Sequence, residues 1–173
     1  MEVFLIRHTL PDTEKGLIYG RYDVPLAESF SKEKEAILKQ LPQAIDVVYS
    51  SPSRRCTKLA ELISPDYSTE EALCELDFGR WETKTWDTIN RTESEFWMED
   101  VMNRCPPGGE SLVQMKERVL QFWQKITSLD AELLVVVTHK GVIRIILSEL
   151  NHIPFSSFFD IKVDYGEIVR VSV

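Results

Sequence analysis

Two histidines in this sequence follow apolar segments closely. Ligands bind at the ends of strands in open α/β sheets, but a single histidine there is more often structural than catalytic, so other residues must converge on the same edge. His8 follows the apolar run 3–6 with only Arg7 between them, and His139 closely follows the apolar run 133–137. Short apolar runs of this kind are typical of buried β-strands. A neutral imidazole can attack phosphorus as a nucleophile, and an arginine beside it can bind anionic oxygens. The two strand ends therefore predict phosphoryl chemistry, provided that other charged groups join them.

Two further segments carry the groups that would complete such a site. Arg54 and Arg55 fall in the first turn of a predicted helix that follows a third apolar run. An arginine there can hold an anion together with the helix N-terminus, and the pattern leaves open which of the two does so. Glu75 lies in a segment rich in carboxylates. Phosphoryl transfer requires cations on the phosphoryl oxygens, a nucleophile in line and an acid for the leaving oxygen, and these residues supply all three.

The elements that must position these residues alternate between strand and helix. This order predicts a three-layer α/β/α fold, with a mostly parallel central sheet and helices on both faces. Because the carboxyl ends of parallel strands meet at one edge, we expect the reactive side chains to lie close together there. We expect strands at 3–6, 46–50, 69–73, 133–137 and 166–173, and helices at 29–41, after a Ser51 N-cap with Pro52, after a Ser111–Gln114 capping box, and at 142–150.

The segments outside these elements provide candidates for substrate contacts. Thr9 and Tyr19 lie in a loop that contains glycine and proline and has no helical or strand period. The segment 84–105 is helical but patchy, which is typical of a cover over a site, and Trp86 and Trp97 within it are candidates for ligand contacts rather than core. No linker or repeat divides the chain, so we expect residues 1–173 to form a single domain with this helical cover.

Composition limits the classes of protein that the chain can belong to. The sequence is 43% hydrophobic and 28% charged, which is ordinary for a globular protein. No apolar run approaches the ~20 residues of a membrane span, and the N-terminus lacks the basic leader of a signal peptide. The cysteines are odd in number and widely spaced, which argues against a disulfide framework and predicts a cytoplasmic protein. A net charge of −8 argues against nucleic acid as a partner.

Four segments, in this order, resemble the motifs of the histidine phosphatase superfamily, which has the phosphoglycerate mutase-like fold. The resemblance runs from Val3 to about Arg144 and implies catalysis without a cofactor. It implies that His8 is the nucleophile, that Glu75 is the general acid, and that Arg7, Arg55 and His139 bind the phosphate. The four segments are Leu5-Ile6-Arg7-His8-Thr9, Ser50-Ser51-Pro52-Ser53-Arg54-Arg55, Glu75-Leu76-Asp77-Phe78-Gly79-Arg80-Trp81-Glu82 and Val137-Thr138-His139-Lys140-Gly141-Val142-Ile143-Arg144.

Departures from the superfamily pattern point to one branch. Thr9 stands where glycine is usual, and together with Tyr19-Gly20 and the segment 106–111 it resembles the α-ribazole 5′-phosphate phosphatases of cobalamin biosynthesis. Lys140 stands where glycine or alanine is common. It is interpreted either as an extra cation at the rim of the pocket or as a solvated side chain, and the second interpretation is favoured.

Two other kinds of site are less consistent with the sequence. Cys74 and Arg80 have the spacing of a cysteine phosphatase loop, but the carboxylates between them would repel phosphate and disfavour a thiolate. A metal site is not expected, because the three histidines show no ligand spacing typical of zinc.

The sequence therefore predicts a phosphate monoester hydrolase with a phosphohistidine intermediate, and the resemblance favours α-ribazole 5′-phosphate as its substrate. We expect Thr9, Tyr19 and Trp97 to contact that substrate. The alternatives are a broad-specificity small-molecule phosphatase, a mutase, a phosphoprotein phosphatase and a non-catalytic phosphate-binding module. The expected partner is a small phosphate ester, with neither nucleic acid nor membrane involved. The oligomeric state is left open, with a homodimer as one option.

Overall fold

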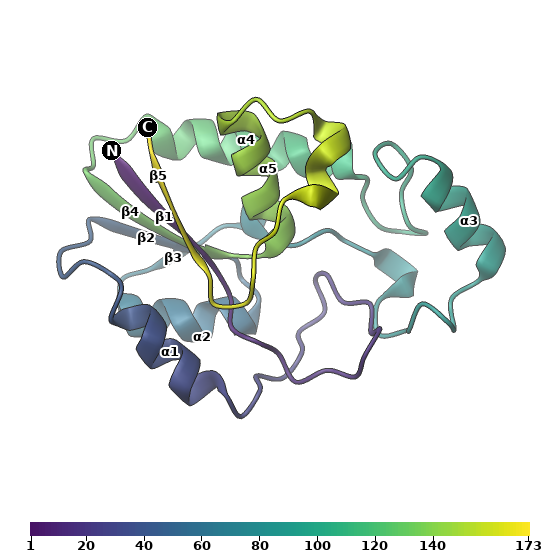
Figure 1. The fold of residues 1–173 in the computed structure, drawn as a ribbon, viewed down its shortest axis with the longest axis horizontal. Coiled ribbons are helices and arrows are strands. Elements are labelled where there is room, and N and C mark those ends of the chain that lie inside the picture. Colours follow the sequence, from purple (N-terminus) through teal and green to yellow (C-terminus); the bar gives the residue numbers. More distant parts are fainter.

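The computed structural model describes all 173 residues and contains a central sheet between two pairs of helices (Figure 1). Short 3₁₀ turns lie at Glu71–Leu73, Gly79–Trp81 and Phe155–Asp160. The strands are β1 (Glu2–Arg7), β2 (Val47–Ser50), β3 (Ser68–Thr69), β4 (Leu133–Thr138) and β5 (Ile168–Ser172), and the helices are α1 (Phe30–Leu38), α2 (Arg54–Ile63), α3 (Arg91–Glu99), α4 (Leu112–Thr127) and α5 (Lys140–Leu150).

The sheet has the strand order β3-β2-β4-β1-β5. The first four of these strands are parallel, and β5 pairs antiparallel with β1. The predicted α/β fold with a mostly parallel sheet is therefore confirmed. The register aligns Arg7 of β1 with Thr138 of β4, which brings the two histidines that follow these residues to neighbouring positions at one edge.

Alternation along the strands divides the apolar residues between two cores. Val3 and Leu5 of β1 face the core shared with α4 and α5, and Phe4 and Ile6 face the core shared with α1 and α2. All four side chains are buried. Because both faces of β1 are covered, its backbone is held firmly and the residues at its end are precisely placed.

Two predicted boundaries are wrong for reasons that concern the site. Ser51 is not the N-cap of α2: its amide donates to the Val137 carbonyl at 2.9 Å, so the chain stays tied to the sheet and the helix begins only after Ser53. The strand predicted at 69–73 is limited to the two residues of β3. A 3₁₀ turn follows it, and the carbonyls of Ala72 and Cys74 accept from Arg118 instead of a neighbouring strand.

The remaining helices agree with the sequence patterns. Ser111 and Gln114 form the predicted capping box at the start of α4. Helix α3 lies within the predicted cover segment, and its N-cap Asn90 accepts hydrogen bonds from the amides of Thr92 and Glu93. Figure 1 shows α3 set apart from the helices that flank the sheet. None of the helices has the length and apolar character that crossing a membrane requires.

Candidate active site

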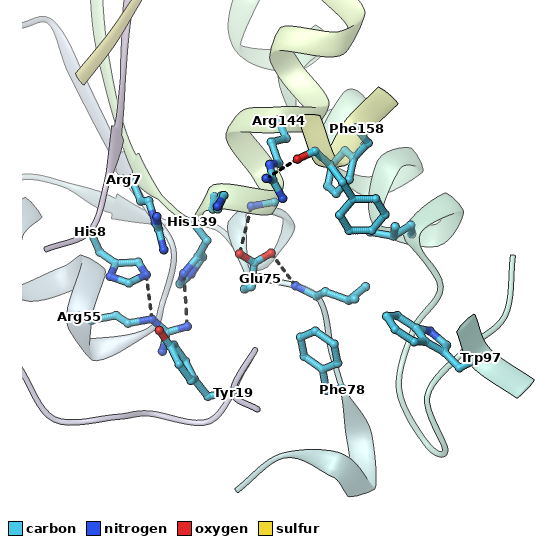
Figure 2. Close-up of a pocket in the computed structure, with 15 residues that line it drawn as sticks. Arg7, His8, Tyr19, Arg55, Glu75, Phe78, Trp97, His139, Arg144 and Phe158 are labelled. Atoms are coloured by element: carbon cyan, nitrogen blue, oxygen red, sulfur yellow. Dashed lines mark hydrogen bonds between the residues drawn. The ribbon is translucent and has the colours of Figure 1, made fainter. Parts of the chain in front are cut away.

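The two strand-end histidines and Arg55 meet at the carboxyl edge of the sheet. His8 and His139 are buried, and their ring centroids are 5.2 Å apart. Arg55, from the first turn of α2, lies beside both rings (Figure 2). Its Nε donates to His8 Nε2 at 3.3 Å, and its Nη2 lies 3.3 Å from His139 Nδ1. The sheet edge thus brings together three groups that are far apart in the sequence.

The loop between β1 and α1 holds the Arg55 guanidinium in place. Arg55 is fully buried, and it donates to the carbonyls of Gly20 at 2.6 Å and Tyr22 at 3.0 Å. Gly20 lies so close to Leu76 that a Cβ atom would be 1.7 Å from the Leu76 carbonyl oxygen. Arg54, by contrast, is exposed. The structure therefore answers the question that the sequence pattern left open: Arg55 is the arginine at the site.

The hydrogen bonds of His8 define its tautomer. Nδ1 lies 2.8 Å from the Thr9 carbonyl oxygen, which can only accept, so Nδ1 carries the proton. Nε2 is then the nitrogen with the free electron pair, and it faces Arg55. Burial, followed by the charge of Arg55, lowers the pKa of His8 to about 3. The ring is therefore neutral near pH 7, as a nucleophilic imidazole must be.

His139 is oriented by Ser51, the residue that leaves β2. Its Nε2 lies 2.8 Å from Ser51 Oγ, and its Nδ1 faces Arg55. Burial and then the charge of Arg55 lower the pKa of His139 well below its usual range. No sequence pattern indicates this partner for Ser51, because its position before a helix is typical of an N-cap.

Arg7 retains free donor capacity at the same edge. Its Nη1 donates to the Val163 carbonyl at 2.7 Å, while its Nε is buried with no hydrogen-bond partner. The guanidinium carbon lies 3.5 Å from the ring centroid of Tyr165, whose hydroxyl is 2.9 Å from that of Tyr19. Sequence reasoning missed Tyr165, since nothing in the loop before β5 indicates that it reaches Arg7. A buried guanidinium donor that is left free in this way is suited to an anionic ligand.

Glu75 approaches the histidines from the other side of the cavity. Its Oε2 accepts from the Gly141 amide in the first turn of α5, and its Oε1 accepts from the Leu76 amide, each at 3.0 Å. A Cβ atom on Gly141 would lie 2.1 Å from Glu75 Oε1. In Figure 2, Glu75 lies between the arginine–histidine group and the side chains of Phe78 and Phe158.

These groups line one cavity of about 200 Å³, and apolar side chains form much of the rest of its wall. Of the predicted substrate contacts, Tyr19 and Trp97 line this cavity, whereas Thr9 is fully buried and does not. Trp86 is 45% exposed and does not line the cavity, although its ring packs against those of Phe78 and Trp97, which do. The apolar lining consists of Leu76, Phe78, Trp97, Leu112, Phe158 and Phe159.

Two further cations, Arg144 and Lys140, line the cavity in addition to Arg7 and Arg55. Arg144 donates to the carbonyls of Ile161 and Phe159 at 2.7 and 2.9 Å, which fixes it at the wall. Lys140 is partly buried as the first residue of α5. Burial and then the charge of Arg144 lower the pKa of Lys140. Of the two interpretations of Lys140, the structure supports the cation at the pocket.

Cys74 does not line the cavity. Burial, and then the charge of Glu71, raise the pKa of its thiol to about 11, so it is a thiol rather than a thiolate near pH 7. Asp77 and Glu82 of the same segment bind backbone amides of the loops. Glu82 accepts from the amides of Arg21 and Phe78 at 3.0 and 3.2 Å, and Asp77 accepts from the Gly79 amide at 2.8 Å. No three histidine, cysteine or carboxylate side chains gather in a way that could hold a metal ion.

The fold and the site together define a class of protein, and the sequence comparison agrees with that class. The chain matches the Histidine phosphatase superfamily (branch 1) over residues 3–173, and it therefore belongs to that superfamily. Members of this superfamily include phosphatases, which fits an edge where two imidazoles and two arginines surround one cavity.

Individual relatives are similar over nearly their whole length. A protein of Hydrogenobacter thermophilus, whose name assigns it provisionally as phosphoserine phosphatase 2, is 28% identical over 98% of this chain and 88% of its own. The adenosylcobalamin/α-ribazole phosphatase of Salmonella typhimurium is 27% identical over 96% of this chain and 87% of its own. The crystal structure of the α-ribazole phosphatase from Shigella flexneri has the same fold, with a TM-score of 0.91, 23% identity, and coverage of 100% and 91% of the two chains.

Proposed function

We propose that this protein hydrolyses phosphate monoesters through a phosphohistidine on His8. The observation that carries the proposal is the position of Glu75 between a cationic group suited to phosphate and an apolar wall suited to a leaving group. A non-catalytic phosphate-binding module would need neither the neutral imidazole nor a carboxylate beside the anion. Membership of a phosphatase superfamily supports the same reaction.

The reaction proceeds in two steps. First, the electron pair of His8 Nε2 forms a bond to phosphorus while the bond from phosphorus to the ester oxygen breaks, and the Glu75 carboxylic acid gives its proton to that oxygen. Second, the oxygen of a water molecule forms a bond to phosphorus while the bond from phosphorus to His8 Nε2 breaks and the electron pair returns to Nε2. The Glu75 carboxylate takes a proton from the water, and inorganic phosphate leaves. Arg7, Arg55 and His139 hold the phosphoryl oxygens in both steps.

We propose α-ribazole 5′-phosphate as the substrate and α-ribazole and phosphate as the products. Its flat heterocycle would contact aromatic side chains such as Phe78 and Trp97, each worth on the order of 1 kcal/mol beyond area burial. The names of the Salmonella and Escherichia coli relatives support this choice. Thr9, which we expected at the substrate, contributes only through its carbonyl contact to His8. The proposal includes a cytoplasmic location and a single domain in which α3 covers the cavity.

One observation favours a second candidate, a phosphatase for small phosphate esters that carry a carboxylate. Lys140 and Arg144 line the cavity beyond the phosphate-binding residues, where a second anionic group would lie. No carboxylate oxygen lies within 4.0 Å of the Lys140 ammonium nitrogen. The Hydrogenobacter relative, named provisionally for phosphoserine, is in line with such a substrate.

A substrate panel separates the candidates. We would compare kcat/KM for α-ribazole 5′-phosphate, a mononucleotide, a sugar phosphate, phosphoserine, phosphoglycerate and a phosphopeptide, in the wild type and in Lys140→Met. We expect the highest value for α-ribazole 5′-phosphate, and less than a twofold change in that value in Lys140→Met. A tenfold preference for phosphoserine that disappears in Lys140→Met would establish the second candidate, and a flat profile would indicate a phosphatase of broad specificity.

A further inference from the structure

The side chain of Arg118 on α4 lies against the segment that carries Glu75. Its Nη1 donates to the carbonyls of Ala72 and Cys74 at 2.7 and 2.8 Å, and its Nη2 donates to the Glu75 carbonyl at 3.2 Å. The side chain is 19% exposed. A single guanidinium therefore contacts three carbonyl groups that surround the proposed general acid.

Glu110 completes the arrangement around Arg118. Its two oxygens accept from Nε and Nη2 of Arg118 at 3.0 and 2.5 Å. Together with the three carbonyls, Glu110 satisfies all five N–H donors of the guanidinium. The same carboxylate accepts from the Asp77 amide at 3.1 Å, and the Glu110 amide donates to the Asp77 carbonyl at 3.0 Å. The segment around Glu75 is thus held on both sides, at 72–75 and at 77.

The residues before Glu110 are shaped for this contact. A Cβ atom on Gly109 would lie 2.2 Å from the Asp77 carbonyl oxygen, and the Arg80 amide donates to the Pro107 carbonyl at 2.9 Å. The segment 106–111 had suggested a branch of phosphatases from the sequence. In the structure, Pro107, Gly109 and Glu110 contact the residues 77–80 that follow Glu75.

We propose that Arg118, paired with Glu110, is a positioning residue for Glu75. The segment between β3 and Glu75 forms a 3₁₀ turn and then irregular chain. Hydrogen bonds to a neighbouring strand therefore do not fix the position of Glu75 at the cavity. Helix α4 is a firm anchor, because Met115 and Val119 on either side of Arg118 are fully buried. The planar guanidinium of Arg118 has five N–H donors, which match three carbonyls and a carboxylate. A lysine ammonium has only three donors and cannot make the same set of hydrogen bonds. This inference rests on the proposed role of Glu75 as the general acid.

The test is the ratio of activity on alkyl and aryl phosphates in Arg118→Lys. Aryl leaving groups need little protonation, so a displaced Glu75 should slow alkyl phosphates selectively. We expect kcat on alkyl phosphates to fall at least tenfold, kcat on 4-nitrophenyl phosphate to fall less than threefold, and KM to change less than twofold for both. Glu110→Gln keeps the shape of the carboxylate and should give the same selective loss if Arg118→Lys does not fold.

Lys125→Met is the matched control. Lys125 lies on the same helix and donates to Glu70 at the start of the same segment, but its side chain is 58% exposed and it touches no backbone carbonyl there. This variant should keep the wild-type ratio. Equal losses on both substrates in Arg118→Lys and Glu110→Gln, while Glu75→Gln shows the selective loss, would overturn the positioning role alone. Equal losses in Glu75→Gln itself would refute the general acid, and the inference with it.

Discussion

Replacing Gly141 by alanine should impair catalysis by displacing one carboxylate. The new Cβ would lie 2.1 Å from Glu75 Oε1, whereas carbon–oxygen contacts are about 3.3 Å, so the carboxyl must move by about 1 Å. A misplacement of about 1 Å can cost roughly 100-fold in rate, which corresponds to about 2.7 kcal/mol of barrier. The Cβ would also lie 2.9 Å from Met115 Cε, but this is the flexible end of a thioether and can shift.

The same change should leave the fold intact. Gly141 lies in α5, and alanine is more favourable than glycine in a helix by about 1 kcal/mol. Gly141→Ala should therefore unfold at the same temperature as the wild type or slightly higher. Loss of activity without loss of stability would distinguish displacement of Glu75 from general damage to the protein.

The assay compares kcat on α-ribazole 5′-phosphate with kcat on 4-nitrophenyl phosphate. We expect a fall of about 100-fold on the alkyl ester and less than tenfold on the aryl ester, and we expect Glu75→Gln to show the same pattern. Glu149→Ala, at an exposed position of the same helix outside the cavity lining, is the control for changes to α5. Full activity of Gly141→Ala on the alkyl ester would refute the reasoning, because the carboxylate would then not need the space above Gly141.

Three other predictions concern pH, metal and the thiol. Between about pH 6.5 and about pH 3, the unfolded chain protonates His8 and the folded protein does not, so His8 should lower the free energy of unfolding by about 1.4 kcal/mol for each pH unit that the pH drops. Urea unfolding at several pH values should therefore show a weaker dependence of the free energy of unfolding on pH in His8→Asn than in the wild type. The same dependence in both proteins would contradict the lowered pKa of His8. Extensive treatment with a chelator should leave kcat unchanged, since the proposed mechanism assigns the stabilisation of the phosphoryl charge to protein cations, and restoration of activity only by added divalent metal would refute that assignment. Cys74→Ser should retain nearly full activity because burial keeps the thiol protonated, and a loss of more than tenfold would require a role for sulfur.

The parts of the fold that depend on local patterns could be predicted from the sequence. Buried strands such as β1 and β4 appear as short apolar runs. The rule that parallel strands share a carboxyl edge then predicts that His8 and His139 lie close together, as the register of β1 and β4 confirms. The capping box of Ser111 and Gln114 could also be predicted, because both of its hydrogen bonds are local.

Contacts between distant segments could not be predicted in this way. Ser51 has the residue type and position of an N-cap, but its hydroxyl contacts His139, which is 88 residues away. Tyr165 reaches Arg7 from the loop before β5, and no periodicity describes a loop. The contacts of Arg118 with the carbonyls of Ala72, Cys74 and Glu75 could not be predicted either, since a single arginine on an amphipathic helix is most often a solvated residue.

The aromatic cover illustrates the same limit. The patchy composition of the segment 84–105 suggested two tryptophans for the cavity, and only Trp97 lines it. Trp86 packs against the outer side of the same cluster, 6.0 Å from the ring centroid of Trp97. The sequence can identify a segment whose aromatic residues are candidates for a cavity, but which ring lines the cavity depends on the packing of Trp97 against Phe78 and Trp81.

The most direct test of the central claim is to trap the phosphorylated enzyme. Wild-type protein would be mixed with substrate labelled on the phosphoryl group, quenched within milliseconds at alkaline pH to preserve phosphohistidine, and digested to locate the label by mass spectrometry. We predict a label on His8 that is stable to base and labile to acid, and none in His8→Asn. A label on any other residue, or full turnover by His8→Asn, would contradict the mechanism.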